Sequence, residues 1–348
     1  MSETWWRREQ FGRRRRNLAA RGRIITAIRD FFAARGFVEV ETPALQRSPG
    51  MEPHLQAFAT EWHHPGEGAT PLYLHTSPEF AMKKLLAAGM PKIFQLARVF
   101  RDGERSPTHH PEFTMLEWYR AGAGYRDLMT DCEDLLRACL AAAEATDFRW
   151  KDRRCDPTRP FERLSMAEAF RRYCGIDLLA TAPDPNAPSF DLLAAAAQPL
   201  GIAPHDGDEW EDLFFRIFLD WVEPQLGLEV PTLLYDYPIA LAALARSKFE
   251  DARLAERFEL YAAGLELANG FGELTDPVLQ RVRFVADQEK KYRRYRSTYP
   301  IDEDFIAALG DMPDSAGIAL GVDRLVMLAT GASHIDDVLW APVSPPQR

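Results

Sequence analysis

The residues from Phe113 to Arg120 alternate between two sets of side chains, one of which could bind a small charged molecule. In an extended strand, every second side chain points to the same face. One face would carry Phe113, Met115, Glu117 and Tyr119, and the other Thr114, Leu116, Trp118 and Arg120. An aromatic ring, a carboxylate and a phenol on one face suit a ligand with a cationic end and a flat ring. The pattern alone does not outweigh a simpler interpretation, an exposed strand with an incidental glutamate.

Two further acids, Glu259 and Glu266, lie on either side of Gly264. In a straight strand they would face opposite sides, so joint binding of one ion requires a bulge or bend, which we expect at Gly264. Carboxylate oxygens suit Mg²⁺, which keeps several waters while it bridges phosphates. A pair of solvated acids explains the same spacing equally well. The alternation continues through Asn269, Phe271 and Glu273.

The candidate residues are carried by segments with clear secondary-structure signals. Two strands joined by a polar loop are predicted at Lys92 to Arg101 and Phe113 to Arg120. The capping hydroxyl, proline and acid of Ser77-Pro78-Glu79 predict the start of a helix after a strand at Leu72 to His75. The remaining expected elements are a helix from Leu18 to Arg35, a strand from Phe37 to Glu41, strands at Pro231 to Tyr237 and Arg257 to Ala262, a helix from Pro277 to Arg294, and a final strand and helix within Gly317 to Thr330.

The segment from about 127 to 227 shows a helical pattern, including the capping box Ser165-Met166-Ala167-Glu168. Its Pro-, Ala- and Asp-rich stretch from Thr181 to Pro188 is typical of a linker. We interpret the segment as a helical insertion that carries little chemistry. No internal repeat is visible.

Composition limits the class of protein. The chain has 348 residues, 46% of them hydrophobic, which is enough for a sizeable core. No run approaches the roughly 20 apolar residues of a membrane span, and no signal-peptide apolar region is present, so we expect a cytoplasmic protein. The four cysteines form no CxxC pair and are expected to be reduced. A net charge of −10 argues against general nucleic-acid binding, and we interpret Arg13 to Arg16 as a solvated helix start or dimer-edge arm.

Taken together, these segments resemble the three signature motifs of class II aminoacyl-tRNA synthetases, most closely those of lysyl-tRNA synthetase. The sequences FFAARGFVEVETP, FRDGERSPTHHPEFTMLEWY and GIALGVDRLVML resemble motifs 1, 2 and 3, and FELYAAGLELANGFGELTD is similar to the lysine-specific block. The resemblance implies an α+β class II catalytic fold, a mainly antiparallel sheet flanked by helices. It covers nearly the whole chain, so we expect residues 1–348 to form a single catalytic domain. Motif 1 implies a homodimer.

The resemblance also implies roles for individual residues. Arg101 would hold the ATP α-phosphate and the substrate carboxylate, and Phe113 and Arg324 would sandwich the adenine. The two arginines would be catalytic. The implied ATP-binding residues are Arg101, Asp102, Gly103, Glu104, His109, His110, Phe113, Glu266, Leu267, Gly321 and Arg324. The implied amino-acid pocket contains Ser77, Pro78, Glu79, Glu117, Tyr119, Asn269, Glu273 and Ala319, and the Mg²⁺ ligands would be Glu259 and Glu266.

Within the class, the chain most closely resembles the family that ligates (R)-β-lysine to elongation factor P. The sequence starts directly at the catalytic motifs and leaves no room for the OB-fold anticodon domain of a full lysyl-tRNA synthetase. The segment HPEFTMLEWYR has this family's form, and Ala319 stands where the synthetases usually have glycine. The resemblance implies ATP-dependent activation of (R)-β-lysine or lysine and transfer to a lysine side chain of elongation factor P. tRNA is then not the expected acceptor, and no membrane is involved.

Two positions depart from the family pattern. The usual glutamate would stand at Gly103, but the acid comes one place later, at Glu104, and His110 replaces the usual asparagine. Two rival functions remain, a truncated synthetase that charges tRNA and a non-catalytic regulatory paralogue. The regulator would be expected to have lost the ATP-binding arginines or the Mg²⁺ carboxylates, and all of them are present. The sequence leaves open whether the amino acid is α- or β-lysine.

Overall fold

In a computed structural model, the protein is described at residues 5–66 and 68–343. A large sheet with the strand order β1-β5-β6-β13-β12-β11-β10-β9 forms its centre. Neighbouring strands are antiparallel except at the β1–β5 and β9–β10 pairs. Its strands are β1 (Val38–Glu39), β5 (Lys92–Phe100), β6 (Glu112–Ala121), β9 (Glu162–Ser165), β10 (Thr232–Pro238), β11 (Leu254–Ala262), β12 (Leu265–Gly272) and β13 (Ser315–Gly321).

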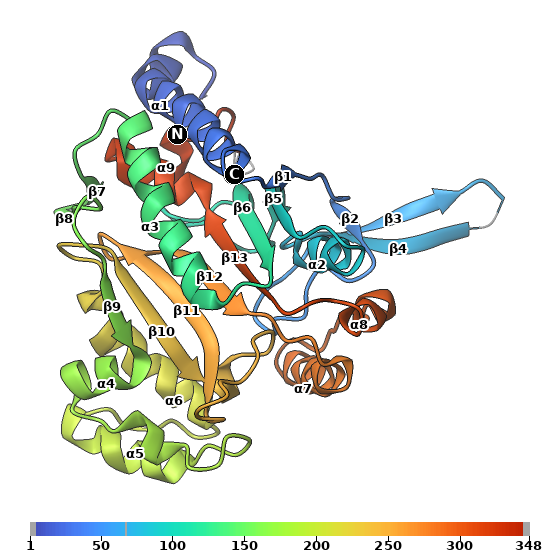
Figure 1. Ribbon diagram of the computed structural model, residues 1–348, viewed down its shortest axis with the longest axis vertical. Helices are drawn as coiled ribbons and strands as arrows, with labels where there is room; N and C mark the ends of the chain where they lie inside the picture. The colour runs from blue at the N-terminus through green and yellow to red at the C-terminus, as the bar shows by residue number, and fades with distance from the viewer. Residues whose placement is uncertain (1–4, 67, 344–348) are drawn as a thin grey trace.

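Helices lie around this sheet on both sides (Figure 1). They are α1 (Arg8–Ala33), α2 (Glu79–Ala87), α3 (Tyr125–Ala142), α4 (Met166–Cys174), α5 (Phe190–Ala197), α6 (Trp210–Ile217), α7 (Pro277–Tyr295), α8 (Glu303–Leu309) and α9 (Val322–Thr330). The expected α+β fold with a mainly antiparallel sheet flanked by helices is therefore confirmed. None of the described helices is long and apolar enough to cross a membrane.

The main core lies between one face of the sheet and helices α1, α3 and α9. The helix α3 buries Leu128, Cys132, Leu135 and Cys139, whose spacing of three and four residues forms one apolar stripe. All four cysteines of the chain are free and buried, as the sequence suggested. The arginine run in α1 is only partly solvated, because Arg14 is buried and donates to the carbonyls of Asp336 and Leu339 at 2.9 and 2.8 Å.

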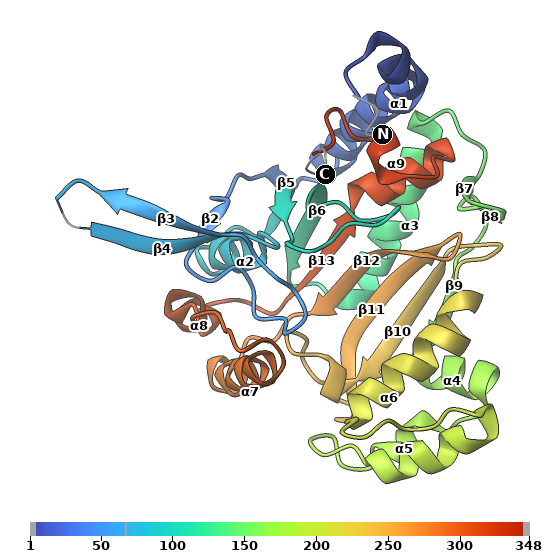
Figure 2. The ribbon, with the colours of Figure 1, turned by 180° about the vertical axis from the view of Figure 1, so that it is seen from behind.

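The segment from 127 to 227 is less uniform than its helical pattern predicted. Within it, α3 packs in the main core, and β9 joins the edge of the large sheet beside β10. The strands β7 (Phe148–Trp150) and β8 (Arg153–Cys155) form a separate small hairpin. The prediction failed for these strands because elements of three or four residues are too short to show a period of two. Helices α4 to α6 do form a hydrophobic cluster of their own at one end of the sheet (Figure 2).

A second, smaller sheet contains β2 (Leu45–Gln46), β3 (Ala59–His64) and β4 (Gly68–Leu74). The β3–β4 hairpin projects away from the body of the protein in both views (Figures 1 and 2). The irregular loop between β2 and β3 instead turns back toward the large sheet, where α7 holds it. Lys291 of α7 donates to the carbonyls of Pro53 and Leu55 at 3.2 and 2.6 Å.

Candidate active site

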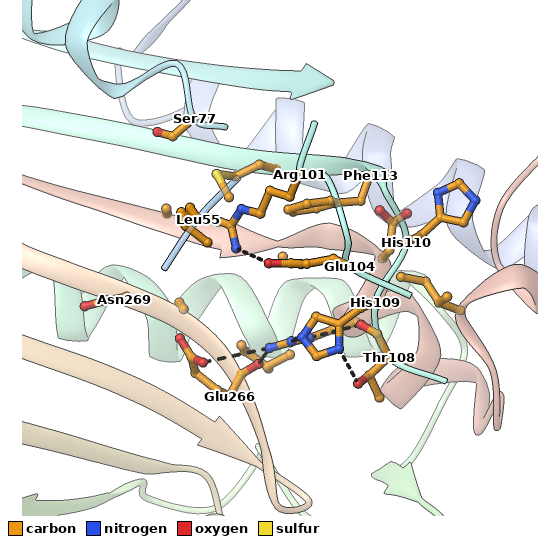
Figure 3. Close-up of a pocket in the computed structure, with 18 of the residues that line it drawn as sticks. Leu55, Ser77, Arg101, Glu104, Thr108, His109, His110, Phe113, Glu266 and Asn269 are labelled. Carbon is orange, nitrogen blue, oxygen red and sulfur yellow. Dashed lines mark hydrogen bonds and ion pairs between the residues drawn. The ribbon is translucent and has the colours of Figure 1, made fainter. Parts of the chain in front are cut away.

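A cavity of about 380 Å³ lies over the face of the sheet opposite the main core. The β5–β6 loop, the start of α2, the strands β12 and β13 and the start of α9 contribute to its walls (Figure 3). The predicted site residues that line it are Ser77, Glu79, Arg101, Glu104, His109, His110, Phe113, Glu266, Leu267, Asn269, Ala319, Gly321 and Arg324. Segments that are far apart in the sequence thus meet in one cleft.

The floor of the cleft is open because β13 places small residues on this face of the sheet. Its alternating residues Ala319 and Gly321 line the cleft, while Ile318 and Leu320 point into the main core. Ala319 pairs with Glu117 of β6 on one side and Asn269 of β12 on the other. Directly paired residues share a face, so these three predicted substrate-pocket residues form one row on the cleft face of the sheet.

Arg101 carries an unused hydrogen-bond donor at one end of the cleft. Among the described residues, no group accepts a hydrogen bond from its buried Nε. The guanidinium lies 5.2 Å from the centroid of the Phe113 ring and 3.8 Å from the Glu104 carboxylate (Figure 3). A guanidinium with a spare donor suits a phosphate or carboxylate oxygen. The pairing with Glu104 also shows that the displaced acid remains in the cleft.

Arg324 is oriented by three acceptors at the same end. It donates to Nε2 of His109 at 2.7 Å, to the carbonyl of Glu266 at 2.7 Å and to the carbonyl of Thr108 at 3.4 Å. Burial and the neighbouring Arg324 cation lower the pKa of His109, which favours the neutral imidazole that can accept this bond. Arg324 therefore lines the cleft in a fixed orientation, together with Phe113.

Apart from the buried acid group described below, four of the residues predicted to bind ATP or substrate are not placed as free ligand-binding groups. The His110 ring is buried, and both of its nitrogens contact the backbone, Nε2 accepting from Val343 at 3.0 Å and Nδ1 lying 2.6 Å from the Glu112 carbonyl oxygen. The others, Pro78, Asp102 and Gly103, do not line the cavity. Gly103 has a φ of +77° in the turn that follows β5, a conformation that glycine adopts without steric cost.

A buried group of acids lies beneath the end of the cleft that Ser77 and Glu79 form. Glu117 is 0% exposed, and its carboxylate accepts hydrogen bonds from Ser77 at 2.6 Å and Tyr119 at 2.8 Å. Burial, together with the nearby Glu79 carboxylate, raises the pKa of Glu117 to about 8. Glu273 is equally buried, and burial raises its pKa to about 7. The structure thus brings the predicted substrate-pocket acids together, although Glu117, Tyr119 and Glu273 lie just behind the cavity wall.

One basic residue that sequence reasoning missed, Lys83 of α2, joins two of these acids. It is 1% exposed, forms an ion pair with Glu79 and lies 2.6 Å from the Glu273 carboxylate. Burial lowers the pKa of Lys83, but Glu273 and Glu79 outweigh this effect and raise it above its ordinary value. Its only signal in the sequence was its spacing of four residues from Glu79. Glu52, from the loop between β2 and β3, also lines the cavity and was not anticipated.

Glu259 and Glu266 lie on two neighbouring strands, and not on one bent strand as expected. Gly264 belongs to the tight turn between β11 and β12, with φ values of +50° at Ala263 and +76° at Gly264. Positive φ at both central residues is typical of a two-residue hairpin turn. The irregularity in pairing comes later, where Leu267 has no direct partner. The expected bulge therefore exists, but it lies three residues beyond Gly264.

Only Glu266 of this pair lines the cavity. Burial and the nearby Glu259 carboxylate raise the pKa of Glu266 to about 7. Glu259 accepts hydrogen bonds at 2.6 Å each from Tyr237, Tyr261 and Arg257. No cluster of three or more potential metal ligands occurs in the described part of the chain. Carboxylate oxygens suit Mg²⁺ as ligands. Glu266 presents its carboxylate to the cleft, whereas Glu259 lies behind the cavity wall and its oxygens already accept hydrogen bonds.

The fold and the cleft define a synthetase-type ligase catalytic domain. The family model for class II tRNA synthetases (D, K and N) matches residues 5–344, and the chain belongs to this family. Its curated relatives include elongation factor P–(R)-beta-lysine ligases from three bacteria. The Sodalis glossinidius protein is 44% identical over 93% of this chain and 94% of its own length. The Haemophilus influenzae protein is 43% identical over the same shares, and the Proteus mirabilis protein is 42% identical over 94% of this chain and 95% of its own length.

Proposed function

We propose that this enzyme uses ATP to activate (R)-β-lysine, or lysine, and transfers the aminoacyl group to a lysine side chain of elongation factor P. The relatives above are named for this reaction, and they match this chain over almost its whole length. The observation that carries the proposal is the charge distribution of one cleft. Arg101 and Arg324 line one end, and the acids around Glu79 and Glu117 lie at the other. A small molecule with a carboxylate and ammonium groups fits this arrangement.

The chemistry requires no nucleophilic side chain. In the first step, a carboxylate oxygen of the amino acid attacks the α-phosphorus of ATP, and the bond to pyrophosphate breaks. In the second step, the unprotonated acceptor amine attacks the acyl carbonyl, AMP leaves, and an amide forms with loss of a proton. The contribution of Arg101 and Arg324 is alignment and positive charge where negative charge builds on phosphate. Three acceptors already hold Arg324 in its orientation, so little reorganisation of this side chain is required.

We propose that Glu266 binds Mg²⁺ at the nucleotide end of the cleft. Glu259 would either support Glu266 or become a second ligand of the ion once its ion pair with Arg257 breaks. The accessible carboxylate of Glu266, close to Arg324 and Glu259, supports this assignment. A bound Mg²⁺ would neutralise phosphate charge and help to orient the phosphates. Phe113 and Arg324 then provide two surfaces for the adenine ring.

We also propose a homodimer and a location in the cytoplasm. The segment that resembles motif 1 contains β1, an edge strand, and exposes Val38 at 48%, and Leu45 of β2 just after this segment is 49% exposed. Exposed apolar residues beside an unpaired sheet edge support a subunit contact. Sedimentation of the purified protein would test the dimer, and a Val38→Lys variant should shift it toward the monomer. Fractionation of cells that express the protein would test its location.

Product analysis tests the central proposal. The enzyme is incubated with ATP, Mg²⁺, either lysine isomer, and either elongation factor P or tRNA, and the products are weighed by mass spectrometry. A mass increase of one lysine residue on elongation factor P is expected. Aminoacylated tRNA in its place would favour the truncated synthetase. Absence of amino-acid-dependent ATP–pyrophosphate exchange would exclude both enzymes and favour a regulatory role.

Arg101→Ala is the matched test of the site. It removes the guanidinium that carries the spare donor, and exchange activity should fall by about 100-fold or more, as for loss of other groups that stabilise transition-state charge. Exposed Arg13 on α1 provides a control, and Arg13→Ala should leave exchange unchanged. Normal exchange by the Arg101 variant would refute the assignment of this cleft.

A further inference from the structure

Glu52 places a carboxylate in the cleft from a loop that has no regular secondary structure. The loop is fixed from two sides, by Lys291 of α7 and by the carbonyl of Gln56, which accepts from the Asp102 backbone N–H at 2.8 Å. The second contact places the loop beside Arg101, and Figure 3 shows Leu55 of this loop next to that arginine. Glu52 thus lines the cleft from a loop that contacts the backbone next to Arg101.

The side chain of Glu52 is folded inward against Gly50. A methyl group added at Gly50 would lie 2.8 Å from a Glu52 carboxylate oxygen and 2.9 Å from the Thr76 hydroxyl. Gly50 also has a φ of +143°, which L-residues rarely adopt. The loop therefore requires glycine at this position in order to bring the Glu52 carboxylate close to Thr76, which lies between β4 and α2.

Glu52 differs from the other acids of the cleft in its partners. Glu79 pairs with Lys83, Glu104 with Arg101, and Glu117 accepts two hydroxyl hydrogen bonds. Within residues 5–66 and 68–343, no side chain hydrogen-bonds or forms an ion pair with the Glu52 carboxylate. Burial and the Glu79 carboxylate raise the pKa of Glu52, an effect that its own backbone N–H and the Arg101 and Lys83 cations only partly offset. A carboxylate in this environment is stabilised by a ligand cation.

The position of Glu52 indicates which cation it would receive. If the substrate carboxylate lies at Arg101, the buried acids around Glu117 receive the ammonium at the far end of a lysine-like chain. Glu52 belongs to the loop whose Gln56 carbonyl bonds the backbone of Asp102, the residue after Arg101, so its partner would be the ammonium close to the substrate carboxylate. This is the amine whose carbon differs between lysine and β-lysine.

We propose that Glu52 is a specificity-determining residue that binds the amine nearer to the reacting carboxylate, beside Glu79. This inference rests on the proposed function and adds to it a division of the acids into two subsites. The far ammonium belongs to Glu117 and Tyr119, and the near one to Glu52. The subsite accepts a primary ammonium on the second or third carbon of an amino acid.

Three substrates separate the two subsites in an ATP–pyrophosphate exchange assay. Lysine and (R)-β-lysine carry both amines, whereas 6-aminohexanoate carries the carboxylate and the far amine only. Glu52→Gln keeps the size of the side chain and removes its charge. For the preferred lysine isomer, kcat/KM should fall by about 10- to 100-fold, the effect of a lost hydrogen bond to a charged group. For 6-aminohexanoate, kcat/KM should stay within about twofold of the wild type.

Two further variants make the result specific. Glu117→Gln should weaken the use of all three substrates, because each has the far amine. Glu61→Gln changes an exposed acid of β3 and should alter none of them. Equal losses for the lysines and for 6-aminohexanoate in the Glu52 variant would indicate a structural role and overturn the inference. Unchanged use of both lysines would overturn it as well, while a wild-type enzyme without exchange activity would refute the proposed function itself.

Discussion

Substitution of Glu117 by glutamine tests the electrostatics of the acid end most directly. The carboxylate is 0% exposed, and the Ser77 and Tyr119 hydroxyls, at 2.6 and 2.8 Å, are its hydrogen-bond donors. Glutamine has nearly the same shape but leaves a buried ligand ammonium without its counter-charge. Truncating one partner of a buried charge pair costs about 2 to 5 kcal/mol. Because about 1.4 kcal/mol corresponds to a factor of ten, kcat/KM for the amino acid should fall by about 30-fold or more.

The pH dependence of kcat/KM shows whether Glu117→Gln acts by removing the charge of the carboxylate or by changing the shape of the site. The raised pKa of Glu117, about 8, means that its carboxyl is protonated at neutral pH in the free enzyme. An ammonium ligand requires the ionised form, so kcat/KM for lysine should rise with pH up to about 8. Glu117→Gln should lose this rise. Exchange assays between about pH 6 and 9 measure both effects. A variant within threefold of the wild type, or one with the same pH profile, would refute the assignment of Glu117 to the ligand ammonium.

Four further variants have expected outcomes. Gly317→Ala would press a methyl group into a tyrosine ring and the Glu273 carboxylate, so urea unfolding should show a loss of about 1 to 3 kcal/mol. Gly22→Ala, in α1 with open space around it, should stabilise by about 0.5 to 1 kcal/mol and serves as its control. Lys83→Met would leave buried acids unpaired and should destabilise the fold by about 3 to 5 kcal/mol in the same assay. A smaller loss than for Gly317→Ala would contradict the pairing role of Lys83. Because the pKa of Glu266 is about 7, affinity for Mg²⁺–ATP should rise between pH 6 and 8, and titration calorimetry should show a weaker rise in Glu266→Gln.

The parts of the site that follow a simple period could be predicted from the sequence. Alternation placed Glu117 and Tyr119 on one face of a strand, and the hydrogen bond between them confirms that they meet on that face. The structure shows the same alternation in β13, with Ala319 on the cleft face and Leu320 in the core. Periodicity worked here because a sheet with two different faces forces every second residue to the same side.

Residues whose position depends on distant segments could not be predicted. Lys83 looks like an ordinary surface partner of Glu79 on a helix, and it is buried because α8 packs against α2, with Phe305 of α8 6.0 Å from the ammonium. Glu52 is brought into the cleft by a loop that Lys291 holds from the other end of the sequence. Local spacing contains no information on either contact, because each is made by side chains more than 200 residues away.

The opposite charges at the two ends of the cleft also determine the direction in which a substrate binds. In the proposed direction, the carboxylate would lie beside Arg101 and an ammonium beside the ionised form of Glu117. In the reverse direction, each charged group of the substrate would face a group of the same sign. Two unit charges 4 Å apart interact by about 4 kcal/mol at an effective dielectric constant of about 20. Binding in the reverse direction would replace attraction by repulsion at both ends. The two charged ends would therefore direct the substrate carboxylate to the nucleotide before any chemistry begins. Because the cleft would align the reactants in this way, it requires no reactive side chain.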